Sequence, residues 1–254
     1  MQRLRILSYN IHKGFSGNIR KYTLGQMRDQ IRKIHPDLIF LQEVHGHHSG
    51  HQKNIRKWPD GSQFEFLAEN LWPHFTYGKN AIYTKGHHGN AILSKFPILY
   101  WENIDISENR FEKRGLLHTI IQISKKHPPL HAVCTHLGLF ENDRKKQLDQ
   151  LSHRIKKIVP NNDLLVVAGD FNDWRGKASV PLIKRTGLKE AFMECHGRYA
   201  KTFPAFFPFL TLDRIYFRGF DVLSAHCLSE PPWDSLSDHA PLNVELRVQL
   251  KNEI

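Results

Sequence analysis

The sequence is poor in cysteine and in acidic residues, and it has no long apolar run. Its three cysteines, Cys134, Cys195 and Cys227, are far apart and show no C-x-x-C spacing, which argues against a disulfide framework or a thiolate metal site. The opening residues have no apolar stretch typical of a signal peptide, and no apolar run approaches the roughly 18 residues that a membrane span needs. These absences predict a cytoplasmic protein with reduced cysteines and no transmembrane segment.

The deficit of acidic residues leaves the chain strongly basic. Lys and Arg number 36 against 25 Asp and Glu, a formal net charge of +11. Such a surplus favours a polyanionic partner, such as nucleic acid, an anionic lipid surface or a phosphorylated small molecule, although a generally basic surface would show the same surplus. No protein partner is evident. The 254 residues contain no internal repeat, low-complexity linker or composition break, so we expect a single domain, 1–254.

Short apolar segments with period-two alternation outnumber helical patterns. We expect strands at 4–10, 37–42, 81–83, 90–94, 98–104, 116–123, 130–136, 164–168, 215–217, 222–226 and 242–248, and helices at 22–34, 64–71, 141–159 and 180–185. Residues 44–62, rich in His, Gly and Asn, are expected to form a long loop, and 198–212 an aromatic loop broken by proline. Many strands without regular β–α alternation predict an α+β domain with two sheets face to face and helices outside.

The segment LLVVAGDFNDW, Leu164–Trp174, combines a buried strand with a polar corner. Asp170 and Asn172 are two positions apart, so in an extended chain their side chains would point the same way. A carboxylate can accept a proton or coordinate a cation, and an amide can hydrogen-bond a neutral oxygen. This pair is what orienting a water molecule against a phosphoester would need.

Other apolar strands also end in residues able to do chemistry. Counting by twos, Leu4-Ile6-Ser8 leads to Asn10, Ile39-Leu41 to Glu43, Ala132-Cys134 to His136, and Leu164-Val166-Ala168 to Asp170. If those faces form the core between the sheets, the polar residues meet at one rim of the sandwich. Asp213 with Arg214, and Ser237-Asp238-His239, complete the set. Each residue alone is more often structural, as a turn residue or a hydrogen-bonded histidine, whereas their occurrence together at strand ends favours a functional site.

Seven segments in order resemble the signature blocks of the endonuclease/exonuclease/phosphatase superfamily, which includes deoxyribonuclease I. They are YNIHKG, LQEV, GNAILSKFPI, THLG, AGDFNDW, LDRIYF and SDHAPL, and they run from Tyr9 to Leu242. The chain is most similar to the small, stand-alone bacterial members. The resemblance implies a four-layer α/β/β/α sandwich of two mainly antiparallel sheets. It also implies a divalent-metal-dependent phosphodiesterase that uses Mg²⁺, or alternatively Mn²⁺, and an activated water.

The same resemblance implies a metal site and a catalytic group. Glu43 of LQEV would ligate the metal with Asn10 and Asp238, since oxygen ligands suit Mg²⁺. The catalytic residues would be Asp170, Asn172, His239, Asp213 and His136. Asp170 would orient or deprotonate the water, and Asn172 would hold a phosphate oxygen. His239 would contact the scissile phosphate with Asp213 fixing its tautomer, and His136 would be a second donor.

Three further residues are expected to contact substrate. Arg114 of KRG would clamp a phosphate, although an ordinary surface arginine fits the sequence almost as well, and His88 and Asn90 would lie near the substrate. His45, His47, His48 and His51 crowd the segment after Glu43. A zinc cluster is conceivable there, but no matching carboxylate or cysteine spacing accompanies them, so we favour a loop bordering the active site.

The substrate is less constrained than the reaction. Net charge, the basic helix 141–159 and aromatic side chains that could stack on bases favour a nuclease-like enzyme acting on nucleic acid. The alternative is a phospholipid or sphingolipid head group, because 203–210 (FPAFFPFL) could enter a bilayer interface. An inositol phosphatase is disfavoured because LTLDRIYF lacks a tryptophan-led block, and an apurinic endonuclease because His136 stands where that branch carries tyrosine.

A non-catalytic basic binding module is a further alternative, from another functional class. Retention of six residues of the implied site speaks against it: Glu43, Asp170, Asn172, Asp213, Asp238 and His239. Endo or exo action, the number of metals and the oligomeric state are left open by the sequence.

Overall fold

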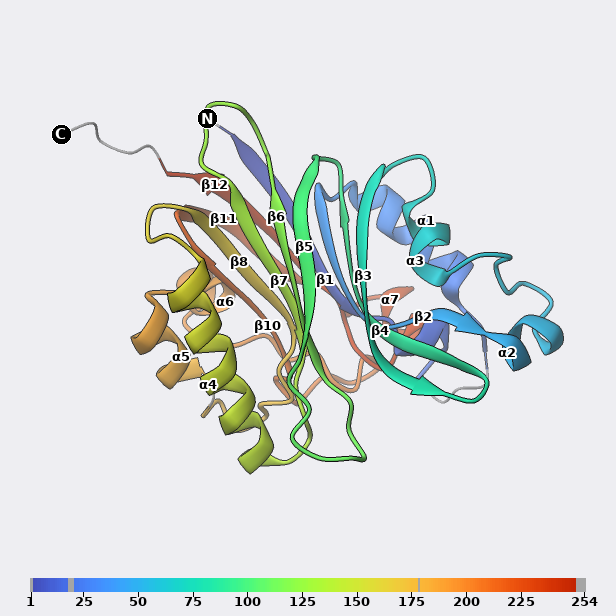
Figure 1. Cartoon of the computed structure of the whole chain (residues 1–254). Coiled ribbons are helices and arrows are strands. Elements are labelled where there is room, and N and C mark those ends of the chain that lie inside the picture. The colour runs from blue at the N-terminus through green and yellow to red at the C-terminus, as the bar shows by residue number, and fades with distance from the viewer. Residues whose placement is uncertain (1, 18–20, 178, 250–254) are drawn as a thin grey trace.

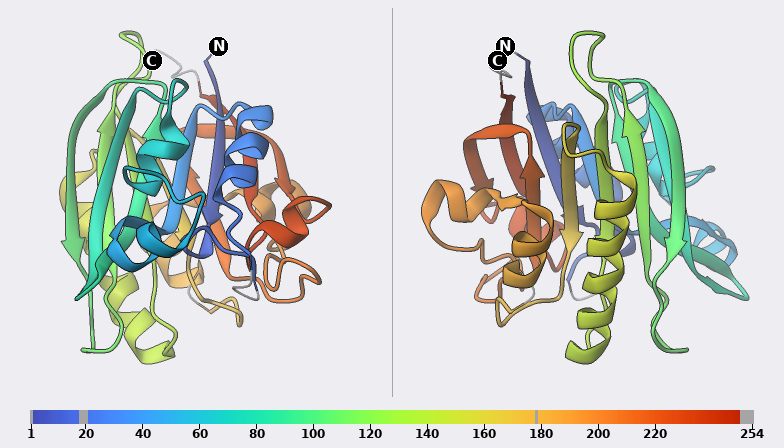
Figure 2. Two further views of the ribbon diagram at one scale, coloured as in Figure 1. Left: turned by 90° about the vertical axis from the view of Figure 1, so that its right-hand side faces the viewer. Right: turned by 60° about the vertical axis from the view of Figure 1, so that its left-hand side comes forward.

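The protein is a four-layer sandwich in a computed structural model that describes residues 2–17, 21–177 and 179–249. Two six-stranded sheets lie face to face, and helices cover the outer face of each sheet (Figures 1 and 2). This confirms the expected α+β class and layer order. None of the helices in the described part of the chain is both long enough and apolar enough to cross a bilayer.

Each sheet is mixed, with mostly antiparallel pairing. The first sheet contains β1 (Arg3–Asn10), β2 (Leu38–His48), β3 (His74–Tyr83), β4 (Gly86–Ser94), β11 (Phe220–Cys227) and β12 (Leu242–Val248). The second contains β5 (Ile98–Asp105), β6 (Gly115–Ile121), β7 (Leu130–His136), β8 (Leu164–Asp170), β9 (Lys189–Glu190) and β10 (Asp213–Arg218). Their orders are β11-β12-β1-β2-β4-β3 and β5-β6-β7-β8-β10-β9. The pairs β1–β2 and β7–β8 are parallel, and the other pairs are antiparallel.

The helices divide between the two outer faces. Those beside the first sheet are α1 (Leu24–Ile34), α3 (Gln63–Ala68) and α7 (Trp233–Leu236), and those beside the second are α4 (Glu141–Ile158) and α5 (Ser179–Thr186). A short α2 (Ser49–Asn54) follows β2, α6 (Ala191–His196) packs near β10 and β11, and η1 (His12–Gly14) follows β1. The predicted helices 22–34, 64–71, 141–159 and 180–185 correspond to α1, α3, α4 and α5.

Alternate residues of the central strands belong to different cores. In β8, Leu164, Val166 and Ala168 face the other sheet, whereas Leu165 and Val167 pack against the α4 side. A strand covered on both faces favours apolar residues at every position, which explains the continuous run LLVVA. The predicted buried strand at 164–168 is therefore confirmed, and the chain emerges from it at the rim as Gly169-Asp170.

The expectation of a long loop at 44–62 is wrong. β2 continues to His48 and α2 follows directly, while β3 is ten residues long rather than the three expected at 81–83. The β2 extension pairs with β4, with His45 opposite His88 and His47 opposite His87. Glycine has a low intrinsic strand preference and histidine is not among the strand-favouring residues, but ladder pairing with a neighbouring strand overrides a weak local preference.

Candidate active site

The polar residues predicted for the rim come from strand ends that lie side by side. His136 at the end of β7 is in register with Asp170 at the end of β8, and Asp170 is opposite Asp213 at the start of β10. In β1, Asn10 is in register with Gln42 of β2. Two parallel pairs, one from each sheet, therefore end at the same edge of the sandwich, which is the arrangement expected from the strand patterns.

Asp170 is buried at the centre of this group. Its Oδ2 accepts a hydrogen bond from Asn10 Nδ2 at 3.1 Å, and its Oδ1 accepts one from the backbone N–H of Asn172 at 2.9 Å. The Nε2 atoms of His136 and His239 lie 3.5 Å and 3.7 Å from the same Oδ2. Burial raises the pKa of Asp170 to about 6, against the lowering effect of His239. A carboxylate of this kind can accept a proton near neutral pH.

His239 lies between two carboxylates. Its Nδ1 is 2.9 Å from Asp213 Oδ2, and its Nε2 faces Asp170. Burial alone would lower the pKa of His239, but the Asp213 and Asp170 charges outweigh it and raise this pKa to about 10. A charged ring can donate from both nitrogens. Asp170, Asp213 and His239 thus form a close buried group in which the imidazole lies between two carboxylates.

His136 is in the opposite charge state. Burial, together with the positive charge of Arg114, holds the pKa of His136 well below its usual value. The two imidazoles that approach Asp170 are thus one neutral and one charged. The site can offer both a neutral donor and a cationic donor to the same small region.

Glu43 reaches the rim by a different route from the one expected. Ile39 and Leu41 pack on the helix side of the first sheet, so simple alternation would point Glu43 away from the space between the sheets. A register shift between Leu41 and Val44, with Glu43 at φ 56°, breaks the alternation. The prediction that Glu43 continues the face of Ile39 and Leu41 is therefore wrong, although Glu43 Oε1 still lies 3.5 Å from Asn10 Nδ2.

The nearest charge to Glu43 is Lys13, from η1. Lys13 Nζ is 2.5 Å from Glu43 Oε2. Burial would raise the pKa of Glu43, but the Lys13 ammonium and neighbouring histidines hold it well below its usual value. An ionised, largely buried carboxylate already has a cation beside it. With the oxygens of Asn10 and Asp238 nearby in the fold, this donor chemistry fits a hard divalent cation such as Mg²⁺.

Asp238 belongs to the same rim through Ser237. Ser237 Oγ donates to the backbone oxygen of Asn10 at 2.8 Å and lies 3.2 Å from Asp238 Oδ1. His12 Nδ1 is 3.8 Å from the same Asp238 oxygen. Asp238 is thus held beside the Asn10 backbone, and over the described residues no hydrogen bond or ion pair joins it directly to Glu43.

Asn172 and Arg114 share one backbone acceptor. Asn172 Nδ2 donates to Leu137 O at 2.9 Å, and Arg114 Nε donates to the same oxygen at 3.1 Å. The expected extended alignment of Asp170 with Asn172 is wrong, because β8 ends at Asp170 and Asn172 adopts φ 49°. In this conformation the Asn172 backbone N–H holds the Asp170 carboxylate, while its amide fixes the segment after His136.

Asn90 and His88 border the group without joining the contacts around Asp170. Asn90 is buried and donates to Gly115 O at 3.1 Å, linking β4 to the second sheet. His88 lies opposite His45, with ring centroids 6.1 Å apart. Glu43 raises and Lys13 lowers the pKa of His88, but burial has the largest effect and lowers it to about 4. His88 is therefore a neutral ring close to the Glu43 end of the site.

Lys13 was missed as a site residue, Ser237 was named beside Asp238 and His239 but given no role, and Phe203 was considered only as part of the segment 203–210. Lys13 and Ser237 stand inside the quoted blocks YNIHKG and SDHAPL, so their block membership was a signal. Phe203 has its ring centroid 5.0 Å from that of His239. It lies within the predicted aromatic loop 198–212, which is confirmed as irregular and contains a bridge between Phe203 and Leu210.

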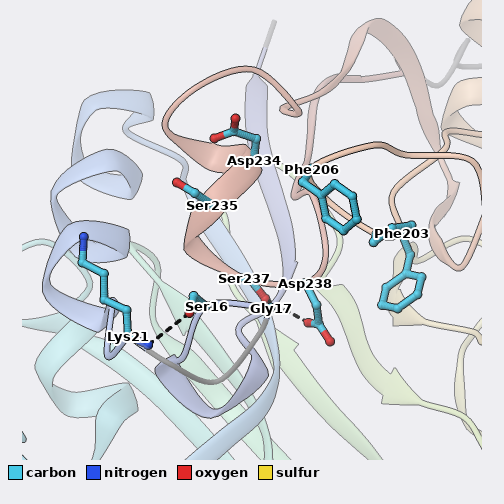
Figure 3. A pocket seen from close by; sticks show the side chains of 10 residues that line it. Ser16, Gly17, Lys21, Phe203, Phe206, Asp234, Ser235, Ser237 and Asp238 are labelled. Carbon is cyan, nitrogen blue, oxygen red and sulfur yellow. Dashed lines mark hydrogen bonds between the residues drawn. The ribbon is translucent and has the colours of Figure 1, made fainter.

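A cavity of about 660 Å³ opens beside Asp238 and Ser237. Figure 3 shows Phe203 and Phe206 on one side of it and Lys21 on the other. The aromatic loop is fixed to the site because the Ala205 backbone N–H donates to Asp238 O at 2.7 Å. Phe206 in the cavity wall and Phe207 and Phe209 nearby in the same loop are 77%, 70% and 55% exposed. An apolar, aromatic surface therefore adjoins the charged rim.

The sandwich with this rim defines a deoxyribonuclease I-like fold. A sequence profile of the Endonuclease/Exonuclease/phosphatase family matches residues 7–239, and the chain belongs to this family. Members of the family are hydrolases acting on phosphoester bonds. The protein YbhP of Escherichia coli (strain K12) is 45% identical over 244 residues, which cover 96% of each chain.

Solved structures with low sequence identity share the fold. D. rerio TDP2 complexed with single strand DNA product has a TM-score of 0.70 at 18% identity, covering 98% of this chain and 100% of that one. The Bacteroides thetaiotaomicron VPI-5482 mannosyl-6-phosphatase Bt3783 has a TM-score of 0.73 at 20% identity, covering 96% and 99%. These similarities establish the architecture and leave the substrate to be argued from the site.

Proposed function

We propose that a single domain, 1–254, hydrolyses a phosphodiester by attack of an activated water, with a divalent metal and with nucleic acid as substrate. The observation that carries the proposal is the buried Asp170, held by Asn10 and flanked by two imidazoles. Phosphoryl transfer chiefly requires positioning and charge stabilisation, and this group supplies a base beside cationic and neutral donors.

The catalytic roles follow from the charge states. Asp170, with its raised pKa, orients the attacking water and takes its proton. His239, charged and oriented by Asp213, donates to the scissile phosphate, and the neutral His136 is a second donor toward the leaving oxygen. Asn172 holds Asp170 through its backbone N–H, which makes it a positioning residue, besides the contact with a phosphate oxygen that the family resemblance implies.

Glu43, Asn10 and Asp238 would hold the divalent cation. Mg²⁺ is the proposed ion and Mn²⁺ the alternative, because the donors are carboxylate and amide oxygens. When bound, the ion supplies positive charge against the phosphate oxygens. Arg114, Asn90 and His88 stay proposed substrate contacts, with Arg114 presenting a guanidinium anchored to Leu137 O.

Nucleic acid is the preferred substrate class because of the +11 charge and the exposed phenylalanines beside the rim. The D. rerio TDP2 structure with a single strand DNA product supports this choice by analogy of fold. The same phenylalanines favour a second candidate, a phospholipid or sphingolipid head group, since an exposed aromatic loop can enter a bilayer interface. The unpaired cysteines agree with the predicted cytoplasmic location.

Hydrolysis of bis-p-nitrophenyl phosphate tests the reaction class. We expect Mg²⁺-dependent turnover that EDTA abolishes, and a loss of at least ~100-fold in rate for Asp170→Asn and for His239→Ala. Asp149→Asn on α4, an exposed carboxylate paired with Arg185 away from the rim, is the matched control and should retain wild-type activity. Wild-type protein no more active than Asp170→Ala would support a non-catalytic binding module instead.

A substrate panel then separates the two substrate classes. Nicking of supercoiled plasmid and cleavage of single-stranded DNA are expected under the nucleic-acid proposal. Release of choline or phosphate from liposomes, without nicking, would assign the lipid alternative.

A further inference from the structure

Three histidines form a compact group beside the active-site rim. One ring nitrogen from each of His45, His48 and His51 lies within 4.8 Å of those of the other two. The rings of His48 and His51 are stacked, with centroids 3.6 Å apart and planes 11° apart. His45 meets both rings edge-on, at 5.1 Å and 5.5 Å. The grouping arises because β2 ends at His48 and α2 begins at Ser49, which turns the chain back on itself.

Two ring nitrogens in this group are buried and have no hydrogen-bond partner among the described residues. His45 is 1% exposed, its Nε2 lies 2.7 Å from the Tyr83 hydroxyl, and its Nδ1 has no hydrogen-bond partner within the described part of the chain. The Nδ1 of His51 is buried and unpartnered in the same sense. Buried polar nitrogens nearly always have a hydrogen-bond partner, so two such nitrogens without one in a single group indicate a ligand between the rings.

We propose that His45, His48 and His51 bind a borderline transition-metal cation, Zn²⁺, with water completing the coordination. Imidazole nitrogens suit Zn²⁺, and three protein nitrogens with one water is an established coordination pattern for this ion. Coordination through His45 Nδ1 uses the tautomer in which Nε2–H donates to the Tyr83 hydroxyl, 2.7 Å away, because the Nδ1 lone pair is then available to the metal. The oxygen donors around Glu43 attract a different class of ion, so the two sites are chemically distinct.

Metal binding has a specific local consequence at α2. His48 Nδ1 accepts from the His51 backbone N–H at 3.0 Å and so caps the helix, which places the proton of a neutral His48 ring on Nε2. Coordination by His48 requires this cap to be released. The ion therefore ties the end of β2 to α2 in place of the capping hydrogen bond, and it fixes the segment that follows Glu43.

The test uses metal-free full-length protein titrated with Zn²⁺, followed by calorimetry and by metal analysis after dialysis. We expect one equivalent of Zn²⁺ that millimolar Mg²⁺ does not displace, a Co²⁺ complex with visible absorption, and a rise in Tm with Zn²⁺. His51→Ala should weaken binding at least ~10-fold. His48→Asn should do the same while preserving the helix cap, because asparagine is a good N-cap residue.

Two matched controls separate this site from the surface and from the catalytic rim. His47→Ala, an exposed histidine of the same strand, should bind Zn²⁺ like the wild type. Glu43→Gln should also keep Zn²⁺ binding, so the result does not depend on hydrolysis. Unchanged affinity and unchanged Co²⁺ absorption in both His51→Ala and His48→Asn would overturn the proposal and leave adventitious binding only.

Discussion

Lys13 Nζ lies 2.5 Å from Glu43 Oε2, so the carboxylate proposed to bind the divalent cation already has a positive partner from η1. The Glu43 side chain is 17% exposed and that of Lys13 is 35% exposed. A buried carboxylate needs a compensating charge to stay ionised, and the ammonium supplies it. The same ammonium opposes the approach of a second cation by Coulomb repulsion.

Lys13→Met should lower stability and tighten Mg²⁺ binding. We expect a loss of roughly 1–2 kcal/mol in the free energy of unfolding without metal, discounted for the partial exposure of the pair. The loss should shrink as Mg²⁺ is added, because the ion replaces the missing charge. Urea unfolding across a Mg²⁺ series measures both effects, with the exposed Lys33→Met as control. A stability gap that does not change with Mg²⁺ would separate Lys13 from the metal site.

Asp213→Asn should lower kcat with little change in KM. The substitution removes the carboxylate 2.9 Å from His239 Nδ1 and leaves a neutral group of the same size. The ring then loses both its orientation and part of its preference for the charged form, so a fall of about 100-fold in kcat is expected. Steady-state kinetics on bis-p-nitrophenyl phosphate measure kcat and KM separately. A rise in KM alone would mean that Asp213 acts on binding rather than on His239.

The exposed aromatic loop distinguishes the substrate candidates. Combined Phe206→Ser, Phe207→Ser and Phe209→Ser should weaken single-stranded DNA binding about 10-fold, since stacking contributes ~1–3 kcal/mol per base. Hydrolysis of the small substrate should be unchanged, because these exposed rings take no part in the contacts around Asp170. Fluorescence anisotropy and liposome co-sedimentation measure the two kinds of binding. Wild-type protein that sediments with anionic vesicles, and a variant that does not, would favour the lipid candidate.

His118→Gln should reduce the loss of stability in acid. His118 Nε2 is 2.9 Å from His131 Nδ1, Arg154 Nε points at its Nδ1, and His131 Nε2 faces Asp163. Burial, with His131, lowers the pKa of His118 to about 4. As the pH falls below 6.5, His118 therefore becomes protonated in the unfolded chain but stays neutral in the folded protein. The free energy of unfolding is highest above pH 6.5 and decreases by up to about 3 kcal/mol as the pH falls toward 4.

Urea unfolding at pH 7.5 and pH 4.5 tests whether stability falls with pH in this way. The wild type should lose more stability between the two values than His118→Gln does, because glutamine does not titrate. An equal loss in both proteins would assign the acid sensitivity to other groups, including His131, whose pKa burial also lowers.

The alternation of side chains along regular strands was predictable from the sequence. Ala132 and Cys134 lead to His136, and Val166 leads to Asp170, and these apolar residues do face the space between the sheets. Period-two alternation is a local property of an extended backbone, so it needs no knowledge of the partner strand. The rule fails at Glu43, where a bulge decided by the pairing of β2 with β4 reverses the face.

The loop predicted after Glu43 from secondary-structure propensity was also wrong. His45 and His48 belong to a strand because β4 pairs with them, and the strand preference of histidine and glycine gives no sign of it. Asn172 departs from the extended path because its backbone N–H hydrogen-bonds Asp170 Oδ1. Both errors concern places where contacts between strands or between a side chain and the backbone outweigh local preference.

The sequence by itself determined the family, the layered architecture and which strand ends carry polar residues. Only the tertiary structure decided that Lys13 pairs with Glu43, that His239 lies between Asp213 and Asp170, and that three histidines converge where β2 meets α2. The physical reason is that strand patterns are set by neighbours along the chain. Contacts between side chains far apart in sequence depend instead on register, bulges and the closure of the two sheets on each other.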